Sequence, residues 1–399
     1  MTLNVLNVIQ SFPFNHSILP KESFVDYLQY CQHKELILAQ VIQDFLAQSP
    51  DNHQWLLPKI LTSKPAQNPT NLTNPYWQWL VKNNVCAYDL IKFVPTESSK
   101  PLWGMGRMGQ SSTLLPDGRA VLIGGEFEDS YDNMFWIYND IIVKHPNGDI
   151  EIFGYPKAIF PPTDFHTATL VGDKIYIIGG MGYYDQRHYG STPIFALDIH
   201  SYAIERIESR NQIGWISDHQ AVAKSGQIIV KGGNVMDDAK SPIRENIDTW
   251  AFNPKTLIWQ NVTKNKWQGF YVQRKDNDWL HLFEYSNLAF YEQITIDNYH
   301  VQFDELTQIL GCKPNLTVYH SLFSPPIAHE IEDSLDESGR FVIIRIDGIK
   351  VRYIDDGMCI QVYIEGILSD EKLAMLQDNL RHKLSKLENM ACEVKLLPL

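Results

Sequence analysis

The stretch KIYIIGG (residues 174–180) decides the fold, because two stretches of the same form accompany it at regular distances. AVLIGG (120–125) precedes it and QIIVKGG (227–233) follows it, so the first glycines of the three pairs stand 55 and then 53 positions apart. Each stretch is a short apolar, β-prone run that ends in two glycines. A repeat with this period indicates a propeller or solenoid built from one supersecondary unit.

The sequence around each glycine pair predicts two β-hairpins per unit. Upstream of the pairs, the turn residues Asp117-Gly118, Gly172-Asp173 and Ser225-Gly226 separate two β-prone runs. Downstream, residues 137–153, 194–208 and 249–263 each contain two further runs around polar turn residues. Four strands per unit is the composition of a propeller blade.

The units resemble the kelch repeat family over roughly residues 105–265. The resemblance rests on the double glycine, on the outer hairpin Thr249-Trp250-Ala251-Phe252-Asn253-Pro254 followed by Trp259, and on a recurring polar residue ahead of each pair. That residue is Gln110, His166 or His219. The resemblance implies a mainly β fold of kelch-like four-stranded blades.

The number of blades stays open at this point. Three units are fewer than family propellers generally need for closure, and Ile152 and Ile204 stand where the third unit has Trp259. Residues 85–90, 269–272 and 279–285 are candidates for further strands of a closed propeller. The other interpretation is an incomplete propeller capped by the regions on either side.

Residues 1–85 predict an N-terminal helical region and a linker. Between residues 20 and 48, apolar residues recur at three and four positions, as in a helical hairpin. Residues 62–76 are rich in Pro, Asn and Thr, which predicts an irregular linker or surface loop. A short helix is expected at residues 77–81, and the kelch-like domain is assigned residues 86–300.

Residues 301–399 predict a small α+β domain. Runs at 341–346, 349–354 and 358–364, separated by turns that contain Asp and Gly, indicate a three-strand meander. Ser369 is the expected N-cap of a helix with one leucine-rich face. A last strand is expected at 392–397.

Composition and charge narrow the class of protein. The chain of 399 residues is 44 % hydrophobic and has a net charge of −13, which argues against general binding of nucleic acid or anionic lipid and favours a basic partner. Residues 270–399 hold 21 acidic and 12 basic residues. The five cysteines are scattered without CxxC spacing, and neither a signal peptide nor a membrane span is recognised. We therefore expect a cytoplasmic protein.

The loops after the glycine pairs are the expected partner-binding surface, since equivalent strands place them on one face. They combine carboxylates with aromatic residues, which is typical of protein-binding surfaces, although ordinary solvated loops are the other interpretation. Acidic runs at 276–305 and 329–337 are expected to steer a basic partner. The candidates are Glu126, Phe127, Glu128, Asp129, Tyr131, Asp132, Tyr183, Tyr184, Asp185, Asp237, Asp238, Glu330, Glu332 and Asp333.

The glycine pairs and the recurring histidines are expected to be structural. No phosphate-binding motif follows the glycines, which are expected to let blades pack closely. His166 and His219 are expected to hydrogen-bond the backbone of a neighbouring blade, the alternative being bases or metal ligands in a central pocket. We assign no catalytic, cofactor-binding or metal-ligating residue.

The predicted function is non-catalytic protein binding. The chain lacks the BTB and F-box companions of eukaryotic kelch adaptors, which favours a cytoplasmic immunity protein that neutralises a basic toxin or effector domain. The alternative from the resemblance is a carbohydrate-active enzyme, a sialic acid mutarotase-like isomerase, with His166, His219, Arg107 and Arg187 as its candidates. An oxidase of the galactose oxidase type needs a Cys crosslinked to a Tyr, and the repeat contains no Cys that could supply this crosslink. A third hypothesis is that the chain is a structural subunit of an assembly.

Overall fold

The computed structural model describes residues 64–86, 103–127, 135–211, 213–239, 242–263, 266–294, 296–332 and 341–397. The chain divides into two compact units. The first holds Met1–Ser63, Thr73–Arg107 and Phe127–Trp136, and the second holds Lys64–Leu72, Met108–Glu126 and Ile137–Leu399. The helical hairpin expected at residues 20–48 lies outside the described residues, and no helix in these ranges is long and apolar enough to cross a membrane.

The described part of the first unit contains the short helix that the sequence predicts. Helix α4 (Pro75–Asn83) confirms the expectation for residues 77–81. Its Trp77 stacks on Trp103 with ring centroids 4.5 Å apart, and both indoles are buried. Cys86 forms a parallel bridge with Met105.

The second unit contains three repeat sheets, each made of the two predicted hairpins. Repeat sheet 1 has the order β1-β7-β6-β3-β2, repeat sheet 2 the order β11-β10-β9-β8, and repeat sheet 3 the order β13-β14-β17-β18. The strands are β1 (Thr70–Asn71), β2 (Ser111–Leu114), β3 (Ala120–Ile123), β6 (Ile141–Lys144), β7 (Ile150–Gly154), β8 (Thr167–Val171), β9 (Lys174–Ile178), β10 (Ile194–Asp198), β11 (Ile204–Arg206), β13 (Gln220–Lys224), β14 (Gln227–Lys231), β17 (Thr249–Asn253) and β18 (Ile258–Asn261).

The predicted turn residues set the register of the inner hairpins. In repeat sheet 3, Lys224 pairs with Gln227 across Ser225-Gly226, whose φ angles are 52° and 75°. Both values are positive, as a two-residue type I′ turn requires. The turn chemistry therefore fixes which side chains of each strand share a face.

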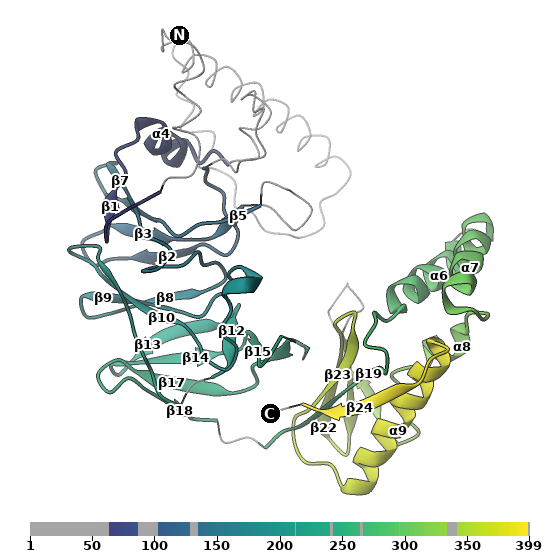
Figure 1. Ribbon diagram of the computed structural model, residues 1–399. Helices are drawn as coiled ribbons and strands as arrows, with labels where there is room; N and C mark the ends of the chain where they lie inside the picture. The colour runs from purple at the N-terminus through teal and green to yellow at the C-terminus, as the bar shows by residue number, and fades with distance from the viewer. Residues whose placement is uncertain are drawn as a thin grey trace. The chain divides into compact units, whose positions relative to one another are not determined.

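The repeat sheets stack face to face and bury two apolar layers (Figure 1). Ile175 and Ile177 of β9 pack toward repeat sheet 1, whereas Tyr176 and Ile178 pack toward repeat sheet 3. Successive side chains of a strand point to opposite faces. Because repeat sheet 2 is covered on both faces, β9 is apolar without alternation, and this explains why KIYII reads as a continuous run.

The predicted linker is tied to two repeat sheets. Its residues 64–72 are mostly irregular, as expected, but β1 pairs with β7. The Asn68 side chain accepts a hydrogen bond from Ile204 N (2.9 Å) and donates one to Ile204 O (2.8 Å). The linker therefore extends repeat sheet 1 by one edge strand and reaches repeat sheet 2.

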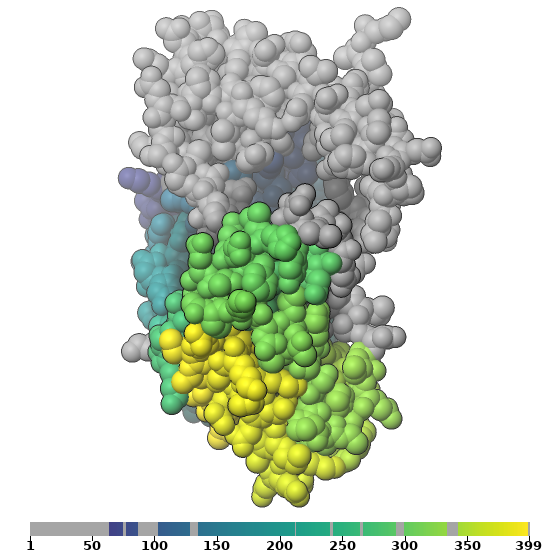
Figure 2. Space-filling view, turned by 90° about the vertical axis from the view of Figure 1, so that its right-hand side faces the viewer, coloured from purple at the N-terminus to yellow at the C-terminus, as the bar shows by residue number. Residues whose placement is uncertain are grey.

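The C-terminal part, residues 268–397, is a six-stranded antiparallel sheet with helices on one face. Its order is β20-β21-β22-β23-β19-β24, and the predicted meander, α9 and β24 are confirmed. Figure 2 shows α6 and α7 in green and α9 in yellow on its surface. The elements are β19 (Gln268–Arg274), α6 (Leu282–Ile294), α7 (Ile296–Leu310), α8 (Leu316–His320), β20 (Glu330–Glu332), β21 (Phe341–Ile346), β22 (Ile349–Asp355), β23 (Cys359–Ile364), α9 (Asp370–Leu387) and β24 (Cys392–Leu396).

The described residues are mainly β, with an α+β C-terminal part, and their sheets do not close into a propeller. Residues 269–272, a candidate for a further blade, lie in β19, which pairs with β23 and β24 instead. Residues 282–285, part of the other candidate, begin helix α6. Helices α6, α7 and α8 were not expected from the sequence.

Candidate functional site

The first two glycine pairs bring their repeat into contact with the segment that leads into the next repeat sheet. Gly180 N donates to Ile216 O (2.9 Å), and a Cβ on Gly179, whose φ is 70°, would lie 2.2 Å from that oxygen. Gly124 repeats the arrangement, since a Cβ there would lie 2.2 Å from Thr163 O. Only glycine permits this approach. These contacts support the structural role expected of the pairs.

The two recurring histidines also connect consecutive repeats. His166 Nε2 lies 2.8 Å from Ser111 Oγ, and His219 Nε2 lies 2.8 Å from Thr167 Oγ1. The partner is thus a side-chain hydroxyl of the preceding repeat, where the sequence predicted a backbone group. Burial lowers the pKa of His166 to about 3 and that of His219 to about 4, so both rings are neutral at neutral pH.

The arginines considered for an enzyme hold nearby backbone. Arg187 Nε donates to Met181 O (3.0 Å), and its guanidinium lies 5.6 Å from the ring centroid of Tyr184. Arg107 Nε donates to Gly104 O (2.8 Å) within the first compact unit. Within the second unit, Arg187, like the two histidines, lines neither of the cavities described below.

The loop after the second glycine pair presents two of its three candidates to solvent. The Tyr183 hydroxyl accepts a hydrogen bond from Ile137 N (2.8 Å), and its ring lies 5.8 Å from Lys157 Nζ. Tyr184 is 65 % exposed and Asp185 is exposed, both on a 3-10 turn (Tyr184–Gln186). Tyr183 therefore anchors a turn that displays Tyr184 and Asp185.

The loops after the first and third glycine pairs present fewer of their candidate side chains to solvent. Glu126 is half-buried and Phe127 is buried in β4 (Glu126–Phe127), which pairs with β5 (Trp136–Ile137). Asp237 accepts two hydrogen bonds from Arg244 (2.6 and 3.1 Å), whereas Asp238 is exposed. These last two border a small sheet of β12 (Trp215–Ser217), β15 (Asn234–Met236) and β16 (Arg244–Glu245). Outside the described residues lie Glu128, Asp129, Tyr131, Asp132 and Asp333.

The acidic candidates near residue 330 lie on the edge strand of the C-terminal sheet. Glu330 is exposed in β20. Glu332 is half-buried, and its carboxylate lies 3.1 Å from Arg345 Nη2 on β21. The structure thus brings Glu332 into an ion pair and leaves Glu330 exposed at the edge of the sheet.

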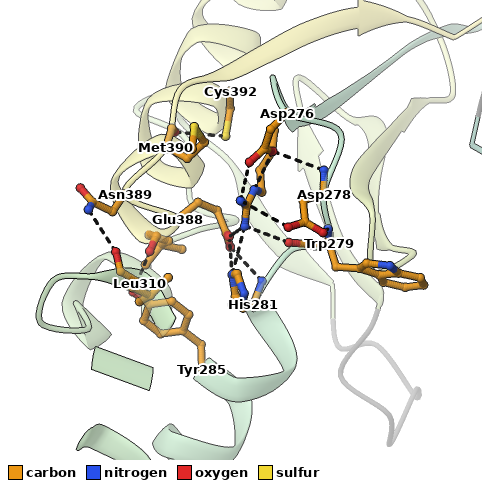
Figure 3. A network of polar contacts seen from close by, with 12 residues as sticks. Asp276, Asp278, Trp279, His281, Tyr285, Leu310, Glu388, Asn389, Met390 and Cys392 are labelled. Atoms are coloured by element: carbon orange, nitrogen blue, oxygen red, sulfur yellow. Dashed lines mark hydrogen bonds and ion pairs between the residues drawn. The ribbon is translucent and has the colours of Figure 1, made fainter. Parts of the chain in front are cut away.

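A buried ionic network organises the start of the other acidic run (Figure 3). The Glu388 carboxylate is fully buried, and Oε2 lies 2.8 Å from His281 Nδ1 and 3.3 Å from Arg274 Nη1, while Oε1 accepts from His281 N (3.0 Å). Arg274 also bonds both oxygens of Asp276 (3.0 and 2.6 Å) and donates to Trp279 O (3.1 Å). The network fixes the loop between β19 and α6 to the end of α9.

This fixed loop and the first turn of α6 display aromatic side chains among carboxylates. Trp279 is 61 % exposed and Phe283 is 67 % exposed. The indole lies over Gly357, where a Cβ would come within 2.8 Å of Cζ3. The backbone on both sides of the indole is held, since Trp279 N donates to the Asp278 carboxylate (2.9 Å) and Leu280 N donates to Gly357 O (2.8 Å). We call Asp276–Glu284 together with Asp355–Met358 the aromatic–acidic surface.

The sequence identified the acidic run at 276–305 but not the aromatic residues of this surface, and it gave Asp355 and Asp356 only as turn residues. Trp279 and Phe283 stand four positions apart in the segment DNDWLHLFE, and that spacing between carboxylates was the available signal. The segment also contains Leu280 and Leu282, which are buried. Local sequence does not say which apolar side chains of such a mixture remain outside.

The cavities in the described part of the second unit include two of a few hundred Å³. One, of about 390 Å³, is a shallow groove between α9 and β24 that includes Arg381 and Cys392. The other, of about 310 Å³, lies beside the loop after the second glycine pair and includes His188 and Trp215. Burial raises the pKa of Cys392 to about 11, so its thiol is protonated at neutral pH.

No family model and no curated protein matches the chain. Across the described ranges, no group of three or more His, Cys, Asp or Glu side chains is placed to hold a metal ion.

Proposed function

We propose that the chain is a non-catalytic protein-binding protein that takes a basic partner on its aromatic–acidic surface. The observation that carries the proposal is the indole of Trp279, exposed on a loop that a buried ionic network holds in place (Figure 3). Exposed tryptophans are costly on a solvated surface and are enriched at the centres of protein interfaces.

The energy available at this surface suits an interface anchor. Covering the exposed part of Trp279, roughly 130 Å², contributes about 3 kcal/mol. The Arg274 hydrogen bond to Trp279 O already restricts the loop, so little conformational entropy is lost when a partner binds. Truncation of this one side chain should therefore weaken binding substantially.

The charge of the surface indicates the chemistry of the partner. Five carboxylates lie on it or next to it, those of Asp276, Asp278, Glu284, Asp355 and Asp356, against two basic residues, Arg274 and Lys275. Arg274 is buried and bonded to Asp276, so these two charges offset each other and four carboxylates remain against Lys275. A Lys or Arg of the partner gains from the carboxylates and from the π face of Trp279 together.

The test is capture of a partner by the full chain and two matched variants. Trp279→Ala removes the proposed anchor, and Phe290→Ala removes another exposed aromatic of the same C-terminal part, 57 % exposed on α6. We expect the partner captured by the wild-type and F290A chains to bind W279A at least about 30-fold more weakly, and affinity to fall with added salt. A partner bound equally by W279A and at equal affinity in high salt would refute the proposal.

Within this class, the finer proposal is a cytoplasmic immunity protein that neutralises a basic toxin. The concentration of acidic residues in the C-terminal part supports it. The test is co-expression with a toxin gene found beside this one. Rescue of growth by the wild-type chain and loss of rescue with W279A is the expected outcome, and failure to bind or protect against that neighbour contradicts this finer proposal alone.

For the scaffold, we propose kelch-like blades in an incomplete propeller. The repeated glycine and histidine contacts between consecutive sheets support it. Repeat sheet 3 turns Ile228 and Val230 toward repeat sheet 2, and its other face exposes Val222, Lys224 and Lys231. A polar outer face is what a terminal repeat needs. We expect Val222→Lys to leave the melting temperature nearly unchanged, whereas a covered face would make it strongly destabilising.

A further inference from the structure

The outer side of β24, an edge strand of the C-terminal sheet, presents backbone groups for further pairing. On its inner side β24 pairs with β19, and the Leu397 N–H donates to Gly269 O (3.1 Å) in that ladder. The direction of these groups alternates along an antiparallel strand, so the N–H and C=O groups of Val394 and Leu396 point away from β19. They form no hydrogen bond with any other described residue.

The charges of β24 match those of a second copy of the chain in one register. Glu393 and Lys395 share a face of the strand. In an antiparallel pairing centred on Val394, Glu393 would lie opposite Lys395 of the second copy, and this contact would occur twice. Moving the centre to Glu393 or to Lys395 keeps the outward backbone groups opposed but sets like charges against each other. Because opposite charges across a strand pair stabilise it and like charges destabilise it, the centred register is favoured.

The ion pair that these two side chains already form leaves capacity for a second copy. Lys395 Nζ lies 2.9 Å from Glu393 Oε1, and the side chains are 41 % and 34 % exposed. An ammonium group has three donors, and a carboxylate has about four acceptor sites. Each side chain can therefore take a partner from the second copy and keep its own.

The opposite edge of the sheet lacks this charge match. That edge is β20, which is three residues long. Pairing of two copies about Ile331 would set Glu330 opposite Glu332, and like charges there would repel. Short, charged edge strands resist such pairing. Of the two edges, β24 is the one suited to a second copy.

The centred register also fills the groove beside β24. Cys392 and Val394 belong to the core beneath α9, and Leu396 lies on the same face of the strand but is 74 % exposed. In this register Leu396 of one copy would lie opposite Cys392 of the other. The groove of about 390 Å³ at that place is lined by Ala374 and Arg381 of α9. Each exposed leucine would thus enter the groove of the other copy, a reciprocal contact of the kind that two-fold interfaces make.

Pairing at β24 would also bring the two α9 helices to a normal packing distance. Helix α9 packs on both β19 and β24 and so lies over the space between them. Because neighbouring strands are about 4.8 Å apart, a two-fold axis through β24 would place the helices about 10 Å apart. Packed helices are usually separated by about 8–10 Å. Ala374, Asp378 and Arg381, which line the groove at helical spacing, would face the second copy.

We propose that two copies of this chain pair through β24 into one continuous antiparallel sheet, with Val394 at the two-fold axis. The two Val394 residues exchange two hydrogen bonds, and Leu396 N of each copy donates to Cys392 O of the other. Cys392 N already donates to Ser385 Oγ (3.0 Å), which ends the ladder. This inference goes beyond the proposed function and does not rest on it, because β24 contributes no residue to the aromatic–acidic surface.

Sedimentation velocity of the full chain measures the pairing, and charge exchange tests its register. We expect the wild-type chain to pass from monomer to dimer between about 1 and 200 µM. Glu393→Lys and Lys395→Glu each set like charges opposite each other twice, so each should weaken the dimer at least about tenfold. The variant with both changes restores opposite charges and should dimerise like the wild-type chain. A wild-type chain that is monomeric at about 200 µM refutes the proposal.

Two further variants assign the dimer to this edge. Leu396→Asn changes an exposed side chain, so it should keep the wild-type melting temperature at about 1 µM but weaken the dimer about tenfold. Lys313→Glu, at an exposed position before α8, is the matched control for Lys395→Glu and should leave the dimer unchanged. A dimer that K395E and L396N weaken no more than K313E does overturns the assignment. Failure of the double charge exchange to restore the dimer overturns the register.

Discussion

The buried network around Glu388 gives the sharpest test of how the C-terminal part is held together. Glu388→Ala removes one carboxylate that serves three groups: His281 N, His281 Nδ1 and Arg274. Breaking a buried ion pair from one side costs about 3–5 kcal/mol. Arg274 keeps its two hydrogen bonds to Asp276, so we expect the free energy of unfolding to fall by the lower end of this range, about 3 kcal/mol.

Glu388→Gln separates charge from hydrogen bonding at the same position. The amide oxygen can still accept from His281 N, which now lies 3.0 Å from Oε1, but the charge that faces Arg274 is lost. We therefore expect an intermediate cost of about 1–2 kcal/mol. Asp378→Ala is the matched control, because its pair with Arg381 on α9 is exposed and should contribute less than about 0.5 kcal/mol.

Urea unfolding followed by circular dichroism measures these differences. With a slope of about 3 kcal/mol per molar urea, E388A should lower the midpoint of the C-terminal transition by roughly 1 M, and D378A should leave it nearly unchanged. The reasoning is refuted if E388A and D378A are equally mild. It is also refuted if E388Q is as damaging as E388A, because hydrogen bonding would then have no separate contribution.

Three further predictions follow from contacts inside the second unit. Gly179→Ala should lower the free energy of unfolding by about 3 kcal/mol, because the new Cβ would clash with Ile216 O and the φ angle is positive. Gly172→Ala, which also has a positive φ but open space around it, should lower it by only about 1 kcal/mol. Equal melting temperatures of the two variants would contradict this. The pKa of His166 is about 3 in the folded chain, below its value in the unfolded chain. Its contribution to the free energy of unfolding is therefore complete above about pH 6.5 and decreases as the pH falls, by about 2 kcal/mol at pH 5. His166→Gln should remove that part of the pH dependence in urea unfolding, and an unchanged pH dependence would oppose it. Buried Cys392, with its raised pKa, should react with a disulfide reagent more slowly than half-buried Cys312 in the native chain, which mass mapping would show.

The local elements could be predicted from sequence because their signals are local. The Ser225-Gly226 turn, the Ser369 N-cap and the leucine face of α9 each depend on residues a few positions apart, and all are present in the structure. Helices α6 and α7 were not predicted, because residues 282–310 mix polar and apolar residues without a clear helical pattern. The acidic residues in this stretch were interpreted as a surface patch instead. Asp276 and Asp278 are exposed, but the loop that holds them leads into those helices.

The sequence by itself determined the repeat, the hairpins within it and the acidic character of the C-terminal part. Only the tertiary structure decided that β19 pairs with β23 and β24, partners about a hundred residues away, because such pairing depends on complementary faces and not on local pattern. It also decided that Trp279 stays outside while Tyr285 is buried, and that Trp215 meets Lys157 around one cavity. Binding surfaces arise where distant segments converge, and convergence is set by packing of the whole chain.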